Sequence, residues 1–119
     1  MQFALMIYQG TTPLPNTDAW NSLPQDEQSK IYADYAALNK TEGLTPGMPL
    51  GLPDSATTVR VVDGQMVTTS GPYAGIDHAV GGYFVLEADD LDAAIEIAGR
   101  IPAARHGGGI EIRPAATYW

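Results

Sequence analysis

Two histidines are the side chains of this sequence that titrate near neutral pH without help from their surroundings. His78 follows Asp77 in a predicted loop that leads into a strand, and loops held by rigid elements often carry catalytic groups. His106 lies between a predicted helix and the last strand, where Glu87 or Glu111 would orient its imidazole for acid–base chemistry. Each also has a simpler interpretation, since His78 would be solvated on an acidic surface and His106 would offset the negative end of a helix dipole. We rank Asp77 and His78 above His106 as catalytic candidates.

The stretch PAARHGGGIEIRPA, residues 102–115, contains three consecutive glycines. A phosphate-binding loop follows a strand and opens a helix, so that backbone amides and the positive dipole end face the anion. Here the order is reversed, which favours a turn whose glycines permit unusual backbone angles and close approach of neighbouring segments. The chain has no cysteine and its two histidines lie far apart in sequence, so no metal-ligand spacing is present. We expect neither a metal nor a cofactor.

The charge of the chain restricts its partners. The formal net charge is −8, from 14 acidic and 6 basic residues, which disfavours a surface that neutralises nucleic-acid phosphates. The basic residues are scattered, so there is no polybasic patch for a membrane surface, and no apolar run approaches the roughly 20 residues that span a bilayer. The N-terminal MQFALMIYQG also lacks the basic region of a signal peptide. We expect a soluble cytoplasmic protein of one domain, residues 1–119, whose partners are small molecules or proteins.

The elements that must position these groups follow from hydrophobic periodicity. Residues 2–8 alternate as a strand that is nearly apolar on both faces, and the proline-containing segment 10–22 is predicted to be a loop. A helix is predicted over Leu23–Lys40, with Ser22 and Gln25 as a capping box. Ile31, Tyr35 and Leu38 would form its buried stripe. Residues 45–52 predict a short edge strand, because glycine and proline are too frequent for a long one.

The second half of the chain gives clearer signals. Asp63-Gly64 between two β-rich runs predicts a hairpin that pairs residues 57–62 with 65–69. A central strand over 81–88 precedes a helix that Asp89 or Asp90 would cap and Pro102 would end. Residues on the buried stripe of this helix would be Leu91, Ala94, Ile95, Ala98 and Ile101. With a last strand around 108–114, the order is β-α-β, an inserted hairpin, then β-α-β. This order predicts a ferredoxin-like α+β fold with both helices on one face of an antiparallel sheet.

The second half also resembles a known family. The segment GPYAGIDHAVGGYFVLEADDLDAAIEIAGRIPAARHGGGIEIRPA is similar to YCII-related proteins of the DGPF type, which carry a GGF/Y strand, a DLDEAI-like helix and a PxxxxGxxEVRP-like end. Residues 70–73, Ser-Gly-Pro-Tyr, stand where the family has DGPF, and residues 75–78 stand where it has an ETKE-like stretch. The early helix of smaller family members carries a histidine, and Leu23–Lys40 contains none. The resemblance implies a dimeric α+β barrel, in which two sheets enclose a cavity, and includes proteins associated with sigma-factor-like regulators.

Strand parity locates a candidate binding surface on the helix-free face of the sheet. Phe84 and Leu86 should face the helices, which turns the intervening residues the other way. The ligand-binding residues predicted on this face are Tyr8, Arg60, Tyr83, Glu87 and Arg113. They would grip a small polar or anionic molecule inside a homodimer, or alternatively pair with one another without binding anything. A second hypothesis is a non-catalytic interaction or regulatory domain that uses its acidic surface and the segment 44–56.

Overall fold

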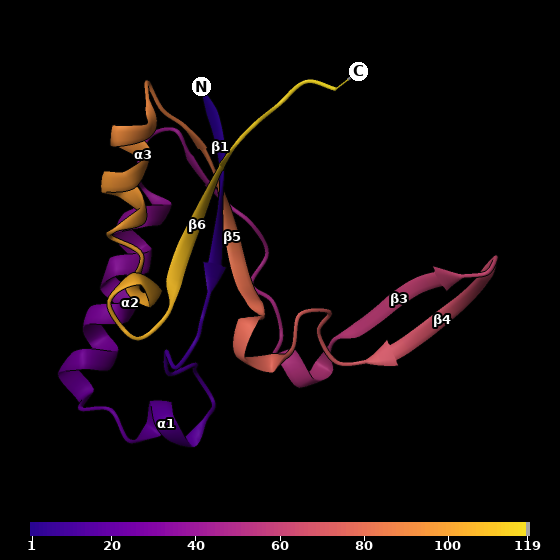
Figure 1. Cartoon of the computed structure of the whole chain (residues 1–119). Coiled ribbons are helices and arrows are strands. Elements are labelled where there is room, and N and C mark those ends of the chain that lie inside the picture. The colour runs from indigo at the N-terminus through magenta and orange to yellow at the C-terminus, as the bar shows by residue number, and fades with distance from the viewer. Residues whose placement is uncertain (119) are drawn as a thin grey trace.

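A four-stranded antiparallel sheet with the strand order β2-β5-β1-β6 forms the centre of the molecule (Figure 1). This order confirms the ferredoxin-like α+β fold. The structure is a computed structural model that describes residues 1–118. The elements are β1 (Gln2–Tyr8), α1 (Asp18–Asn21), α2 (Gln25–Asn39), β2 (Leu44–Pro46), β3 (Thr57–Val62), β4 (Gln65–Ser70), β5 (Val80–Glu87), α3 (Leu91–Ala98) and β6 (Gly109–Pro114), with one-turn 3₁₀ helices at Pro53–Ser55, Ile76–His78 and Pro102–Ala104.

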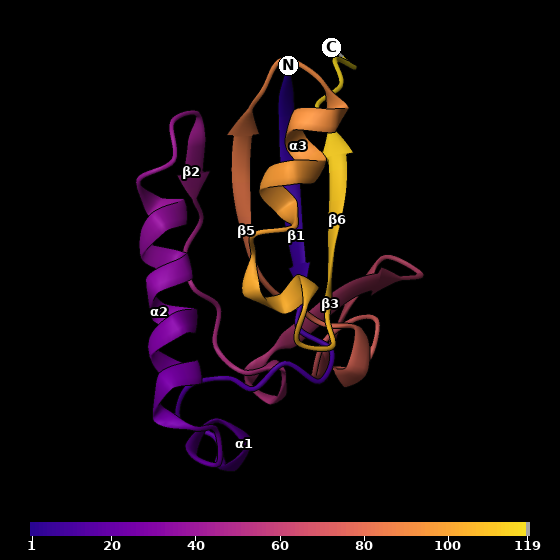
Figure 2. The same cartoon turned by 90° about the vertical axis from the view of Figure 1, so that its left-hand side faces the viewer.

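Both longer helices cover the same face of the sheet, as predicted. Figure 2 shows α3 in front of β1 and β6, while α2 lies beside the edge formed by β2 and β5. The core forms between these helices and the alternate residues of the strands that face them. Its buried members are Phe3, Leu5, Ile7, Leu38, Leu44, Phe84, Leu86, Ala94, Ile101 and Ala103. Removal of this apolar surface from water is the main stabilising contribution to the fold.

The N-terminal end of α2 differs from the prediction of a helix that begins at Leu23 with a capping box. The helix α2 begins at Gln25, after Pro24, and no side chain caps it. Ser22 instead donates its hydroxyl hydrogen bond to the carbonyl of Asp18, so the predicted capping box does not form. The reason is a separate helical turn, α1, inside the segment predicted to be a loop; Thr17 caps this turn by accepting from the backbone amide of Trp20.

The helix α3 confirms its predicted cap and corrects its predicted stripe. The Asp90 carboxylate accepts from the amide of Ala93, 2.8 Å away. Leu91 and Ile95 are exposed, because the helix packs on the sheet through the small residues Ala94 and Ala98. The helix also ends at Ala98, before the predicted end at Pro102, and the chain then turns so that Ile101 enters the core.

The predicted hairpin forms, but it does not join the main sheet. Strands β3 and β4 pair in the predicted register as a separate two-stranded sheet, and Asp63 and Gly64 have positive φ angles of 51° and 79°, as a type I′ turn requires. Figure 1 shows the hairpin projecting away from the helix-free side of the sheet. The predicted edge strand also forms, as β2, but it spans only Leu44–Pro46 instead of residues 45–52, and it pairs with β5.

Among the helices that the structure describes, none combines the length and the hydropathy that crossing a membrane requires.

Candidate functional site

The helix-free face of the main sheet, called the open face below, carries four of the five predicted ligand-binding residues. Tyr83 lies opposite Met6, and Arg113 lies opposite Ala4, in the antiparallel registers of β5 and β6 with β1. Paired residues point to the same face of a sheet, so Tyr8, Tyr83, Glu87 and Arg113 all lie on the open face. Strand parity therefore placed these four residues correctly. Together with Met6 and Val85 they make a surface that carries Glu87 and Arg113 near the start of β1, Met6, Tyr83 and Val85 along its middle, and Tyr8 at the other end.

The charged residues of the open face have partners within the same chain. The Glu87 carboxylate accepts a hydrogen bond from the N-terminal amino group of Met1 at 2.9 Å. The Arg113 guanidinium donates to the Glu111 carboxylate at 3.4 Å. All of these groups are exposed, and ion pairs of this kind contribute little to stability because water screens them. They are weak enough for a ligand or a partner surface to replace.

The structure separates Arg60 from the other four residues. Arg60 lies on β3, in the projecting hairpin, and not on the main sheet. Sequence parity assigned it to the open face on the assumption that the hairpin continues the sheet. The structure gives the hairpin no strand neighbour in the main sheet, so parity within β3 carries no information about the open face.

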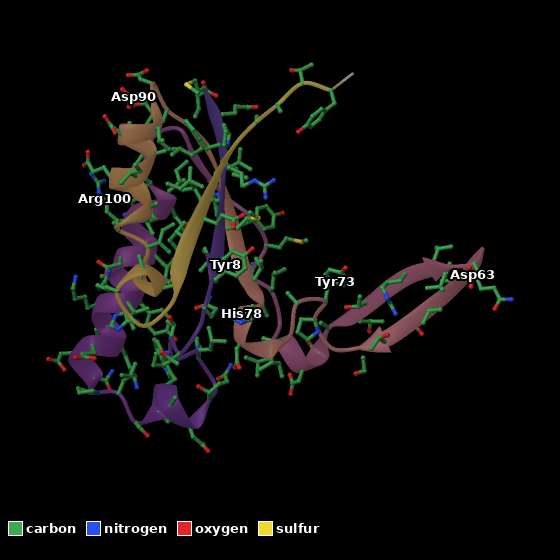
Figure 3. All side chains as sticks on the ribbon, viewed as in Figure 1. Tyr8, Asp63, Tyr73, His78, Asp90 and Arg100 are labelled. Carbon is green, nitrogen blue, oxygen red and sulfur yellow. The ribbon has the colours of Figure 1, made fainter. Side chains whose placement is uncertain are left out.

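The three catalytic candidates lie in two separate places. Asp77 and His78 lie in the exposed 3₁₀ turn that leads into β5, below Tyr8 in the view of Figure 3. His106 lies in the turn before β6, where it is half-buried and its carbonyl accepts from the Thr12 hydroxyl. Within residues 1–118, neither imidazole has a hydrogen bond or an ion pair, and no three His, Asp or Glu side chains form a metal-binding group.

The glycine run after His106 serves chain packing. Gly107 has a φ of 95°, and a methyl group added there would lie 2.0 Å from the Thr11 hydroxyl oxygen. A methyl group on Gly108 would lie 2.2 Å from the carbonyl oxygen of Tyr8. The amide of Gly108 donates to the carbonyl of Ala103, so it is not free to bind an anion. The glycines let the turn before β6 approach the chain that leaves β1, as the reversed order of elements predicted.

A cavity that sequence reasoning missed lies between the helix layer and one end of the sheet. Its volume is about 790 Å³, within the usual range of small-molecule sites. Trp20 and Tyr32 meet edge to face in its wall, with ring centroids 5.3 Å apart. Other lining residues are Ile7, Gln9, Leu14, Tyr35, Asn39 and Phe84, together with the segment 46–52. The only sequence signal was a tryptophan in a segment predicted to be a loop, and one aromatic residue does not define a cavity.

A charged cluster lies between α2 and the turn that follows Pro102–Ala104. Asp34 forms ion pairs with Arg105 and with Lys30, the latter at 3.3 Å. Burial raises the pKa of the Asp34 carboxyl, but the hydrogen bonds from Arg105 and Lys30 outweigh burial and lower the pKa below its ordinary value. Burial also raises the pKa of the neighbouring Tyr35 phenol, against the attraction of Arg105. Tyr35 therefore stays neutral at physiological pH.

Comparison with known proteins gives two matches. The sequence model of the YCII-related domain matches residues 1–116, which is almost the whole chain. An uncharacterized protein of Rhizobium meliloti (strain 1021) is 25% identical over 123 aligned positions, which cover 99% of this chain and 94% of that protein.

Proposed function

The chain belongs to the YCII-related domain family, and from this premise we propose that it forms a two-fold homodimer that binds a small polar or anionic molecule between the open faces of its two sheets. The observation that carries the proposal is an apolar surface that the elements of residues 1–118 leave partly exposed. Tyr83 and Val85 are exposed on the open face, and Met6 lies between them and β6. A second sheet stacked about 10 Å away would bury these side chains.

The projecting hairpin supports a second copy as the covering partner. Val59, Val61 and Met66 are 55%, 68% and 74% exposed and lie on one face of the hairpin, because Val61 pairs with Met66. A two-stranded hairpin is only marginally stable in water when nothing packs against it. The hairpin extends beyond the open face, on the side where a second sheet would stack (Figure 1). One two-fold contact would therefore cover both exposed surfaces.

The chemistry of the open face favours a small ligand with a carboxylate or a similar planar anion. Arg113 offers a guanidinium whose only carboxylate contact in the described chain is the exposed Glu111. A guanidinium binds a carboxylate through two parallel hydrogen bonds, a stronger arrangement than a single contact at 3.4 Å. The Tyr8 and Tyr83 rings supply apolar walls with hydroxyl groups. No described residue orients either histidine, so the primary proposal is ligand binding without catalysis. Acid–base activity at His78 and Asp77 would be an additional function of the same protein.

Thermal shift with a panel of small carboxylates, such as malonate, succinate and benzoate, tests the ligand. We expect at least one of them to stabilise the protein, and Arg113→Gln to lose this stabilisation. Arg100→Gln is the matched control, because Arg100 also pairs with one exposed carboxylate, that of Glu96, but lies in the turn after α3. Absence of any stabilisation, or an equal loss in both variants, would contradict binding at the open face.

The alternative is a protein-interaction module built on the segment after β2. This segment exposes Met48, Leu50 and Leu52 in a chain of net charge −8. A monomeric protein without a ligand response that binds a purified basic protein in a salt-sensitive manner would favour this alternative.

A further inference from the structure

We propose that the cavity between the helix layer and the sheet is a second, separate binding site, which takes a neutral aromatic molecule carrying a hydroxyl or amide donor. The first argument is the composition of its wall. None of the lining residues is Asp, Glu, Lys, Arg or His. A charged ligand would lose its hydration without gaining a counter-charge, so the site selects neutral molecules.

The second argument is the shape and chemistry of the apolar wall. Trp20 is buried and presents an aromatic surface beside Tyr32, at an interplanar angle of 73°. Aromatic rings pack favourably edge to face as well as offset and parallel, and an aromatic ligand would add a third ring to this pair. A volume of about 790 Å³ exceeds what a single six-membered ring fills and matches a molecule of two or more rings.

The third argument is an unsatisfied acceptor in the wall. The Gln9 side-chain oxygen, Oε1, is buried and has no hydrogen-bond partner in the described chain. Leaving a buried acceptor unpaired costs about 1–3 kcal/mol. The Gln9 side chain lies directly against Gly81, where an added methyl group would be 2.3 Å from its Cγ. A ligand O–H or N–H group that meets this amide after a rotation of the side chain would remove the penalty, which gives the site its preference for a donor.

This site differs from the one on the open face in a way that experiments can resolve. The aromatic pair comes from α1 and α2 in the helix layer, whereas the proposed dimer contact lies on the open face and the hairpin. Binding in the cavity therefore does not need a dimer. A variant that dissociates the proposed dimer should still bind the aromatic ligand, so failure of one proposal does not entail failure of the other.

The test uses three probes of matched shape: 2-naphthol, 2-methylnaphthalene and 2-naphthoate, measured by equilibrium dialysis at pH 7. We expect one 2-naphthol site per chain, with about tenfold weaker binding of 2-methylnaphthalene and no saturable binding of 2-naphthoate. Gln9→Met, which preserves length but removes the acceptor, should reduce the affinity for 2-naphthol to that for 2-methylnaphthalene. Gln25→Met, at the exposed start of α2, is the control and should bind like the wild type.

A second variant keeps the proposal testable if Gln9→Met does not fold. Leu14→Trp enlarges a lining side chain and should abolish binding of both neutral probes, while far-UV circular dichroism stays unchanged. The proposal is overturned if 2-naphthol shows no saturable binding, if 2-naphthoate binds as tightly, or if both lining variants bind like the wild type.

Discussion

Val61→Lys on the projecting hairpin is the sharpest test of the proposed dimer. Val61 is 68% exposed in the single chain and shares a hairpin face with Val59 and Met66. Full burial of a valine side chain stabilises by about 1.5–3 kcal/mol, so burying the exposed part of Val61 would contribute about 1–2 kcal/mol. The contact occurs twice in a two-fold dimer, and the lysine adds the cost of desolvating an ammonium group. We expect at least about 2 kcal/mol weaker association, which is roughly 30-fold in the dissociation constant.

Sedimentation equilibrium measures this change directly. The wild-type protein should have twice the chain mass of 12.6 kDa, and Val61→Lys should move towards the mass of one chain at micromolar concentration. Ile95→Lys is the matched control, because Ile95 is 52% exposed but lies on α3 in the helix layer, on the other side of the sheet. The reasoning is refuted if the wild type sediments as one chain, or if Ile95→Lys dissociates it as strongly as Val61→Lys.

Three further substitutions test the fold that positions both sites. Asp34→Asn should lower the free energy of unfolding by about 0.5–1 kcal/mol at pH 7. Because the pKa of the Asp34 carboxyl in the folded protein lies below 3.8, the stability difference between wild type and variant should vanish as the pH falls through this lowered pKa, which urea titrations at several pH values would measure. Asp90→Ala removes the α3 cap and should cost about 1 kcal/mol, seen in calorimetry as a melting temperature lower by roughly 4–8 °C. Gly108→Ala brings a methyl group to 2.2 Å from the Tyr8 carbonyl oxygen and should cost more than the cap, whereas equal stability in urea would show that the turn can move.

The elements that sequence reasoning located correctly are those with strictly local signals. The hairpin follows from Asp63-Gly64, since two adjacent residues with positive φ angles match the twist of paired strands. The cap of α3 follows from an aspartate placed just before an apolar helical run. Alternation along β1 and β5 fixed which residues face the helices. None of these inferences requires knowledge of another part of the chain.

The incorrect predictions concern residues whose burial or position depends on contacts with segments that are distant in the sequence. Leu91 and Ile95 fit an apolar stripe as well as Ala94 and Ala98 do. The two alanines are the residues buried against the sheet, because small side chains allow the helix to approach it more closely. Arg60 has the parity of an open-face residue only if the hairpin continues the main sheet, and sheet membership is a tertiary property. In both cases the local pattern was compatible with two packings.

The aromatic cavity was not predicted because its lining residues come from several segments that are distant in the sequence. Its wall combines the turn around Trp20, the part of α2 from Ile31 to Asn39, the segment 46–52 and the first half of β5. No spacing in the sequence connects these segments, and most lining residues are types that ordinarily occur in a core. A cavity becomes visible only when the volume that these side chains leave unfilled is known.

The strand β5 joins the two proposed sites, because it contributes residues to both. Gly82 and Phe84 line the cavity and Val85 lies on the open face, whereas Tyr83 belongs to the open face and also lines the cavity. Tyr83 also reaches across this division, since its ring packs on Gly47 so closely that an added methyl group would lie 2.4 Å from it. Gly47 belongs to the cavity wall and donates its amide hydrogen bond to the Tyr83 carbonyl at 2.8 Å. A ligand that moves the segment 46–52 would therefore move a residue of the proposed interface. If it does so, the ligand changes the dimer affinity, and by linkage dimer formation changes the affinity for that ligand by the same factor.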